Sequence, residues 1–423
     1  MENKLTSEPT PRYRKYVLWI LTGVYAFNFI DRQILVILQE QIKGELGLSD
    51  TQLGLLTGLA FAMFYVILGI PIARLADRSN RKNIVTVALT VWSGMTALSG
   101  LAQNYTQLML ARIGVGVGEA GGSPPAHAII SDYYPPEKRA TALSIYSMGV
   151  YIGIFIGFLV GGIIGQKYGW RIALYSLGIP GIAYAILVYF TVKEPVRGIM
   201  DNVKTEQEYS FWEVFRILFS KKTFVFVAFA TGAQTITNYG VGNWLPSFLE
   251  RIHGMDIAKI GVILAISIGL GGGAGTFFGG YIADKMRHKT VKWALWVGAI
   301  GAAINIIPAT IFFFSGNLTL VLASVFVSNF LTALYLGPSI AVSHSLVPAK
   351  MRAMASAILF LILNAIGLGL GPLLIGALSD YLEPTYGVES LRYAFTVTYI
   401  TGIITVALFY LASKYYPREL EEA

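Results

Sequence analysis

Two stretches of the sequence, ARLADRSNRK at residues 73–82 and GYIADKMRHK at residues 280–289, decide the architecture. Each ends an apolar run with an Ala-Asp-basic triplet and a basic cluster, and Asp77 lies 207 residues before Asp284. The same offset relates Gly54 to Gly261. Such a repeat indicates two parallel halves that arose by duplication.

The composition of the 423-residue chain requires a membrane around part of it. Hydrophobic residues make up 55% and charged residues only 13%, whereas soluble domains carry about 25% charged residues. The chain has no cysteine, which excludes disulfides, thiolate metal sites and cysteine catalysis.

Apolar segments of the length that crosses a bilayer, roughly 20 residues, recur along the whole chain. No small-residue cleavage site follows the basic stretch at residues 12–15, so we expect an uncleaved first span. The twelve predicted spans are 17–41, 51–75, 83–103, 106–131, 140–165, 171–192, 223–249, 258–282, 291–314, 318–346, 353–379 and 393–415.

The basic residues are distributed unevenly between the two sides of this arrangement. With the N-terminus inside, 24 Lys and Arg fall on the cytoplasmic side, six on the opposite side and two, Arg32 and Arg112, within spans. This positive-inside bias predicts a bacterial-type inner (plasma) membrane protein with both termini cytoplasmic. It also accounts for the net charge of +8, so we expect no nucleic-acid partner.

One connection is long and polar, and it divides the chain near its middle. Residues 193–222 include the run KEPVRGIMDNVKTEQEYS and follow the sixth span. The predicted domains are therefore an N-terminal six-helix bundle at 1–192, a cytoplasmic linker at 193–222 and a C-terminal six-helix bundle at 223–423.

The repeated loops resemble the signature that the major facilitator superfamily carries between its second and third spans. Arg112, Gly116 and Gly118 in the fourth span match a second signature of that superfamily. Ala73 and Asn80 depart from the pattern, because glycines are common there. The resemblance covers the whole length and implies an all-α membrane fold, with twelve transmembrane helices in two pseudo-symmetric bundles that rock about a central cavity.

A narrower set of residues resembles the Spinster-like lipid transporters. The matching segments are NFIDR at 28–32, DRSNRK at 77–82 and RIGVGVGEA at 112–120. This resemblance implies a secondary transporter for a lysophospholipid or related sphingolipid, with proton coupling, and leaves the choice among these substrates open.

Four ionisable residues, Asp31, Arg32, Arg112 and Glu119, fall deep in the N-terminal spans. Each would cost at least ~2.5–3.5 kcal/mol if it faced lipid at a helix centre, so we expect them to face the bundle interior or the cavity and to pair. Arg112 and Glu119 are seven residues apart and share one helix face. Asn28 precedes Arg32 by four residues and adds an amide beside the group.

These charges allow two interpretations. In the first they form a static network that fixes helix registry. In the second, Asp31 and Glu119 carry protons, while Arg32 and Arg112 pair with these acids or with an anionic headgroup. Burial raises the pKa of a carboxyl group and a nearby arginine lowers it, so a group that alternates between these surroundings suits proton coupling.

The C-terminal spans carry no Asp, Glu, Lys or Arg at mid-depth. A charged wall opposite a neutral one suits an amphipathic substrate, although several of the neutral side chains could simply pack between helices. The expected cavity residues of the C-terminal half are Asn238, Tyr239, Asn243, Trp244, Asn329, Tyr335 and Asn364.

The repeated loops are expected to act as a conformational latch formed by Asp77, Arg78, Arg81, Asp284 and Arg287. Glycines at 149, 153, 157, 161 and 165 in span five and at 261, 269 and 273 in span eight form stripes of small residues. Small residues at this spacing let helices approach closely, and the resemblance would place these two spans against each other.

Other functions are less well supported. A multidrug or organic-anion exporter of the same fold stays an alternative, although Phe158 follows Gly157 where the drug-antiporter signature expects proline. A membrane-embedded lipid enzyme lacks a catalytic constellation, so we expect no enzyme, no catalytic residue, no cofactor and no metal. The expected partners of this monomer are the substrate, protons and membrane lipids.

Overall fold

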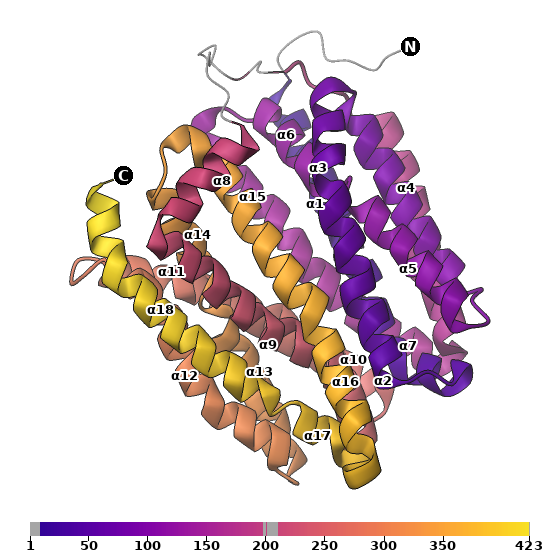
Figure 1. Cartoon of the computed structure of the whole chain (residues 1–423). Coiled ribbons are helices and arrows are strands. Elements are labelled where there is room, and N and C mark those ends of the chain that lie inside the picture. Colours follow the sequence, from indigo (N-terminus) through magenta and orange to yellow (C-terminus); the bar gives the residue numbers. More distant parts are fainter. Residues whose placement is uncertain (1–8, 198–199, 201–209, 423) are drawn as a thin grey trace. The chain divides into compact units, whose positions relative to one another are not determined.

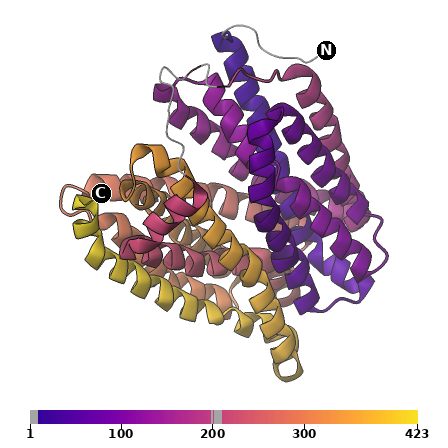
Figure 2. The ribbon, with the colours of Figure 1, turned by 45° about the horizontal axis from the view of Figure 1, so that its top comes forward.

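The computed structural model describes residues 9–197, 200 and 210–422, which are almost wholly helical. Figures 1 and 2 show long helices gathered into bundles. The α-helices are α1 (Pro11–Leu46), α2 (Asp50–Gly54), α3 (Ala60–Arg78), α4 (Arg81–Ser99), α5 (Tyr105–Glu119), α6 (Ser123–Tyr133), α7 (Pro136–Thr191), α8 (Phe211–Ser220), α9 (Lys222–His253), α10 (Ile257–Leu264), α11 (Gly273–Met286), α12 (Trp293–Phe314), α13 (Leu318–Ala333), α14 (Leu336–Ser345), α15 (Arg352–Leu363), α16 (Gly369–Tyr386), α17 (Ser390–Ala394) and α18 (Val397–Glu421).

Shorter helical turns of other types join several of these helices. Three are π-helical, and the residues on both sides of each remain helical, so the turn widens the helix without ending it. The π-helical turns are η1 (Leu55–Leu59), η2 (Ala265–Gly272) and η4 (Asn364–Leu368), and the 3₁₀ turns are η3 (Ala349–Met351) and η5 (Gly387–Glu389).

The helices account for the predicted membrane spans. Among the described residues, seven helical runs are long and apolar enough to cross a membrane. Helix α7 has 56 residues, about 84 Å at 1.5 Å per residue, so it holds two spans across a ~30 Å hydrocarbon layer. Its helical geometry breaks at Gly169, where φ is 81°. The run Met354–Glu421 likewise holds two, and α4, α5 with α6, and α9 lie at the remaining predicted positions.

Local sequence explains where the first helix begins and ends. Pro11 occupies the first turn of α1, and the Thr10 side chain accepts a hydrogen bond from the backbone N–H of Tyr13, which is a typical N-cap. Gly47 follows the last turn at φ 64°, a left-handed conformation that favours glycine.

The residue contacts divide the chain into two compact units. The N-terminal unit contains Met1–Leu48, Ala60–Glu206 and Asp256–Ala265, and the C-terminal unit contains Ser49–Leu59, Gln207–Met255 and Ile266–Ala423. Each half therefore contributes one short segment to the contacts of the other. The predicted domain boundaries stay a prediction, and most of the polar part of the linker at 193–222 lies outside the described residues.

Glycines bring α1 and α7 together in the N-terminal unit. A Cβ on Gly149 would lie 2.6 Å from the carbonyl oxygen of Thr22, and one on Gly153 would overlap that of Ala26. The stripe of span five therefore packs on α1. The expected contact between spans five and eight is present as well, and it is made through Gly162, whose Cβ would lie 3.2 Å from the Cα of Gly261.

The C-terminal unit has an apolar core between α9, α12, α15 and α18. Phe224, Leu295, Leu359 and Phe409 are fully buried there. Lipid tails are as apolar as these side chains, so close packing holds such helices together more than removal from water does.

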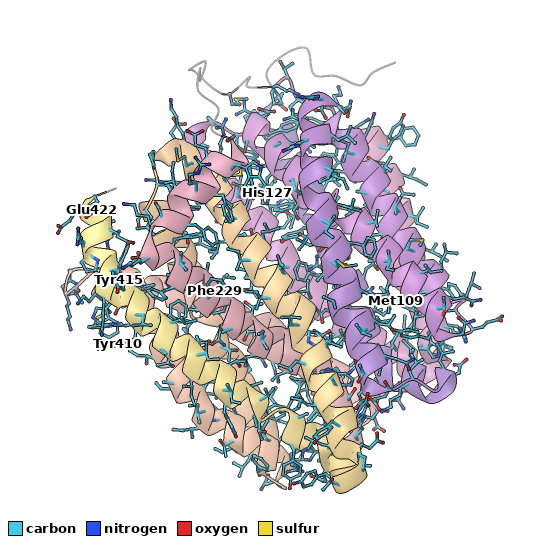
Figure 3. All side chains as sticks on the ribbon, viewed as in Figure 1. Met109, His127, Phe229, Tyr410, Tyr415 and Glu422 are labelled. Atoms are coloured by element: carbon cyan, nitrogen blue, oxygen red, sulfur yellow. The ribbon has the colours of Figure 1, made fainter. Side chains whose placement is uncertain are left out.

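Large apolar side chains also cover the outside of the helices. Tyr410 and Tyr415 of α18 lie at the edge of the molecule in Figure 3 and are 53% and 36% exposed, and Phe229 of α9 is 47% exposed. Such surface on a water-soluble monomer would be a site of association. On a chain with these spans, it is the surface that meets the bilayer.

Candidate functional site

The predicted charged residues come together inside the N-terminal unit. Helix α1 supplies Asn28, Asp31 and Arg32, and α5 supplies Arg112 and Glu119. Asp31 and Glu119 are fully buried, and Asn28 and Arg112 are each 3% exposed. Arg112 and Glu119 lie on one face of α5 because they are separated by two helical turns.

Arg32 and Glu119 form a buried ion pair between α1 and α5. The Glu119 Oε2 atom lies 2.7 Å from Nε and 2.6 Å from a terminal nitrogen of Arg32. The guanidinium carbon also lies 4.8 Å from the ring centroid of Phe61 and 5.2 Å from that of Tyr65. Contacts of this kind attract a cation to an aromatic face. Arg32 is therefore held by one carboxylate and by aromatic rings.

Asp31 reaches different partners from those of its neighbour Arg32. The Ser93 hydroxyl of α4 donates to its Oδ2 atom at 3.0 Å. Arg112 donates to the backbone carbonyl oxygen of Asp31 at 3.3 Å. Adjacent helical residues point about 100° apart, which explains why one side chain faces α4 and the other faces α5.

The group contains two acids and two arginines, so its formal charges cancel when all four are ionised. Several of its polar atoms have no hydrogen-bond partner among the described residues: Asn28 Oδ1, Asp31 Oδ1, Arg112 Nε and Glu119 Oε1. Buried polar groups are normally paired, and exceptions concentrate where a site does chemistry or binds something. Among the four ionisable members, the Arg32 side chain has the largest exposed fraction, at 10%.

Arg81, one of the predicted latch residues, lies in a second charged group. It pairs with Asp132 at 2.6 Å and with Glu194 at 2.9 Å, and Glu194 also accepts the backbone N–H of Lys82 at 2.8 Å. Glu194 thereby caps the start of α4. The sequence analysis missed Asp132 and Glu194, although both are acids at the ends of apolar spans on the side predicted to carry the basic loops.

The other predicted latch residues are not gathered in this way. Arg78, Asp284 and Arg287 are exposed. Asp77 lies in α3, and its side chain is outside what the structure describes.

A small cavity of about 40 Å³, lined by both polar and apolar side chains, lies in the C-terminal unit. It brings together Asn238 and Asn329, both predicted, with Asn305 and Ser328, which the sequence analysis missed. Asn305 Oδ1 and Ser328 Oγ have no hydrogen-bond partner among the described residues. Since a water needs about 10–15 Å³ measured this way, the cavity has room for about three or four waters.

Other predicted cavity residues of this unit are bonded to neighbouring backbone or side chains. The indole N–H of Trp244 donates to the Pro372 carbonyl oxygen at 2.8 Å, and Trp244 is fully buried. The Tyr335 hydroxyl is 3.0 Å from that of Thr235. Asn243 donates to the carbonyl oxygen of Tyr239 at 2.7 Å, and Asn364 begins the π-helical turn η4.

Comparison with known proteins identifies the family. The model described as Major Facilitator Superfamily matches residues 21–312, most of the chain. The chain belongs to the major facilitator superfamily. The predicted family and its all-helical fold are confirmed.

Within the superfamily the chain is similar to Spinster-type transporters. A solved bacterial homologue of the human lysosomal transporter Spinster, in an inward-facing and unoccupied conformation, matches with 31% identity and a TM-score of 0.91. The match covers 97% of this chain and 99% of that one. Protein spinster homolog 3 of Danio rerio is 26% identical over 447 residues, which cover 97% of this chain and 87% of the relative.

An exporter is also among the relatives. An MFS-type efflux pump of Mycolicibacterium smegmatis is 31% identical over 416 residues, covering 96% of this chain and 94% of the relative. This major facilitator protein is therefore a multi-pass, Spinster-like secondary transporter of a small substrate, and it is not an enzyme.

Proposed function

We propose that this transporter moves an amphipathic anionic or zwitterionic lipid, such as a lysophospholipid, by alternating access coupled to protons. Glu119 and Asp31 carry the proton, and Arg32 and Arg112 bind the acidic headgroup. The observation that carries this proposal is the Arg32–Glu119 pair, which couples an arginine able to bind an anion to a carboxyl group able to bind a proton.

The coupling follows from charge balance inside the N-terminal unit. With both acids ionised, each arginine is compensated and an added anion would be in excess. When Glu119 takes up a proton, Arg32 loses its partner, and an unpaired buried charge is strongly unfavourable. An anionic headgroup restores the balance, so proton and substrate occupancy rise together.

The contrast between the halves supports an amphipathic substrate. The ionised groups at mid-depth belong to the N-terminal unit, whereas the C-terminal unit offers amides, hydroxyls and aromatic rings. A lipid with one acidic head and one acyl tail needs both kinds of surface, while a small dianion needs only the first.

We propose that the protein lies in the plasma membrane with both termini in the cytoplasm, and the positive-inside bias supports this orientation.

We also propose that residues 77, 78, 81, 284 and 287 act as a conformational latch. An Asp77→Asn protein should then show altered accessibility of cytoplasmic positions to a water-soluble thiol reagent. Unaltered accessibility would contradict the latch.

Transport by a Glu119→Gln protein tests the proposal. In liposomes, a pH gradient should drive uptake of a labelled lysophospholipid by the unchanged protein. The Glu119→Gln protein should lose the dependence on the gradient, because glutamine cannot exchange a proton. Glu45→Gln is the matched control, since Glu45 pairs with Arg171 at an exposed position. Undiminished gradient dependence in Glu119→Gln would remove Glu119 from the mechanism.

The efflux-pump relative favours one alternative, an exporter of drugs or organic anions. A thermal-shift screen of the purified protein with lysophospholipids, sphingoid phosphates and drugs separates the two. A ligand that binds the folded state raises the melting temperature by mass action. A rise with drugs and none with lysolipids would support the alternative.

A further inference from the structure

Two short segments belong by their contacts to the unit that is formed mostly by the other half of the chain. Residues 49–59 begin span two and join the C-terminal unit, and residues 256–265 begin span eight and join the N-terminal unit. They are related by the 207-residue repeat, which places Ser49, the N-cap of α2, on Asp256, the N-cap of α10. Both lie at the end of a span that is predicted to face outward.

The first segment is held by a buried ion pair. Both terminal nitrogens of Arg251 lie 2.6 Å from the carboxylate oxygens of Asp50, one on each oxygen. The Ser379 hydroxyl donates to Asp50 as well, at 2.7 Å. Asp50 is 2% exposed and the Arg251 side chain 14%. A bidentate salt bridge of this kind is among the strongest contacts that arginine makes.

A second carboxylate holds the same segment from another helix. Asp380 of α16 accepts the backbone N–H groups of Asp50 at 2.9 Å and Thr51 at 2.7 Å, and the Thr51 hydroxyl at 2.5 Å. The N–H groups of a helix's first turn have no acceptor within the helix, and negative charge is favourable beside them. Helices α9 and α16 therefore both bind the start of span two through charged side chains.

Glycines let the segment approach α16 without side chains between them. A Cβ on Gly54 would lie 2.6 Å from the carbonyl oxygen of Pro372, and one on Gly58 would lie 2.9 Å from that of Gly369. The ionic contact and this close packing act on the same eleven residues.

The second segment is held differently. Ile257 occupies the position equivalent to Asp50 and is buried. Its backbone oxygen would lie 2.8 Å from a Cβ on Gly162 of α7. The acid of this segment, Asp256, pairs only with exposed Lys259 of its own helix among the described contacts. Apolar packing replaces the ion pair at this end.

Each exchanged segment ends in or next to a π-helical turn. The turn η1 (Leu55–Leu59) ends at the boundary before Ala60, and η2 (Ala265–Gly272) spans the boundary after Ala265. Such turns weaken the regular hydrogen-bond ladder and are a recognised cause of kinks. Both helices therefore have a place to bend where they pass from one unit to the other.

We propose that Asp50, Arg251 and Asp380 are gating residues of transport, which clamp the outer end of span two on the C-terminal unit and release it once in each cycle. The clamp rests on the alternating access of the proposed function. Residues 49–59 continue directly into α3, which belongs to the N-terminal unit. If one unit moves relative to the other during transport, either the helix bends at η1 or the clamp opens. An ion pair suits a contact that opens repeatedly, because water restores most of what the separated charges lose.

The absence of cysteine from the chain allows a direct test with a single introduced thiol. Leu53 of α2 is 1% exposed, so a Leu53→Cys protein in liposomes should react slowly with a membrane-impermeant maleimide. Adding Asp50→Asn should raise the labelling rate about tenfold or more, because a buried arginine loses its partner. Adding Asp256→Asn, the matched change at the other segment, should leave the rate unchanged. An equal rate with and without Asp50→Asn would overturn the proposal.

A second thiol distinguishes a gate from general loosening. Leu295 of α12 is fully buried in the core of the C-terminal unit. A Leu295→Cys protein should stay unreactive in the Asp50→Asn background. Labelling at both positions would show that the ion pair only stabilises the fold. The double exchange Asp50→Arg with Arg251→Asp restores an ion pair, so it should bring the labelling rate of Leu53→Cys back toward its original value. If the rate stays high and Leu295→Cys also becomes reactive, the result would count against the clamp.

These labelling rates involve neither protons nor lysolipids, so they test the clamp separately from the proposed coupling.

Discussion

The two halves of this transporter share a sequence repeat at an offset of 207 residues, yet they differ in the polar residues that they place near mid-membrane depth. Near mid-depth the N-terminal unit holds the group of two acids and two arginines around the Arg32–Glu119 pair, while the C-terminal unit has amides and hydroxyls there, several of them around a cavity of about 40 Å³. The difference shows that the shared fold requires neither arrangement. The charged group is therefore a property of the N-terminal half's own sequence, and the proposed coupling gives it a role that would offset the cost of burying it.

Removing one charge from the N-terminal group should give the largest effect. Arg32→Ala leaves Glu119 buried without its partner, and breaking a buried pair costs about 3–5 kcal/mol. The free energy of unfolding in mild detergent, from a chemical denaturation series, measures this loss. Arg32→Lys is the matched variant and should lose less stability, since lysine keeps the positive charge but lacks the planar set of N–H donors of the guanidinium group. A loss no larger for Arg32→Ala than for Arg32→Lys would contradict the pairing.

Adding a charge to the C-terminal unit should give a somewhat smaller effect. Asn305 is 9% exposed beside the cavity, and Asn305→Asp would place a carboxylate there without an arginine. We expect a loss of about 2.5–3.5 kcal/mol at neutral pH, as for an acid at a helix centre. The loss should shrink in acid, because protonation removes the charge. Asn305→Ser, which keeps a neutral polar group, should be milder at every pH. A fully tolerated aspartate would mean that the two units do not differ as described.

An exposed pair on the N-terminal unit should matter least. Lys259 lies 2.8 Å from Asp256, with side chains 72% and 55% exposed. Exposed pairs contribute little because water screens both charges, so Lys259→Gln should lower the free energy of unfolding by only a small fraction of the loss from Arg32→Ala. A loss as large as that of Arg32→Ala would show that burial does not determine how much an ion pair contributes to the free energy of unfolding.

Much of the fold could be predicted from the sequence, because hydrophobic length and basic loops report directly on the bilayer. The twelve apolar runs predicted the helices, and the two related loops, 207 residues apart, predicted the repeat. The site could be predicted in part for the same reason. An ionisable residue inside an apolar run has few places to go, so Asp31, Arg32, Arg112 and Glu119 had to turn inward.

Partners that come from distant helices could not be predicted. Nothing near Arg81 in the sequence points to Asp132 or Glu194, and nothing near Asp50 points to Arg251. The glycines of span five allowed close approach but did not say which helix approaches, and it is α1. Spacing along one helix fixes a face, while only the packed bundle fixes what that face meets.

Proton uptake on substrate binding tests the central claim most directly. A lysophospholipid added to the purified transporter in weakly buffered detergent, with a pH indicator, should cause net proton uptake, and the Glu119→Gln protein should bind the lipid without it. Equal proton uptake by both proteins, at equal lipid occupancy, would contradict the claim that Glu119 exchanges its bond to Arg32 for a proton.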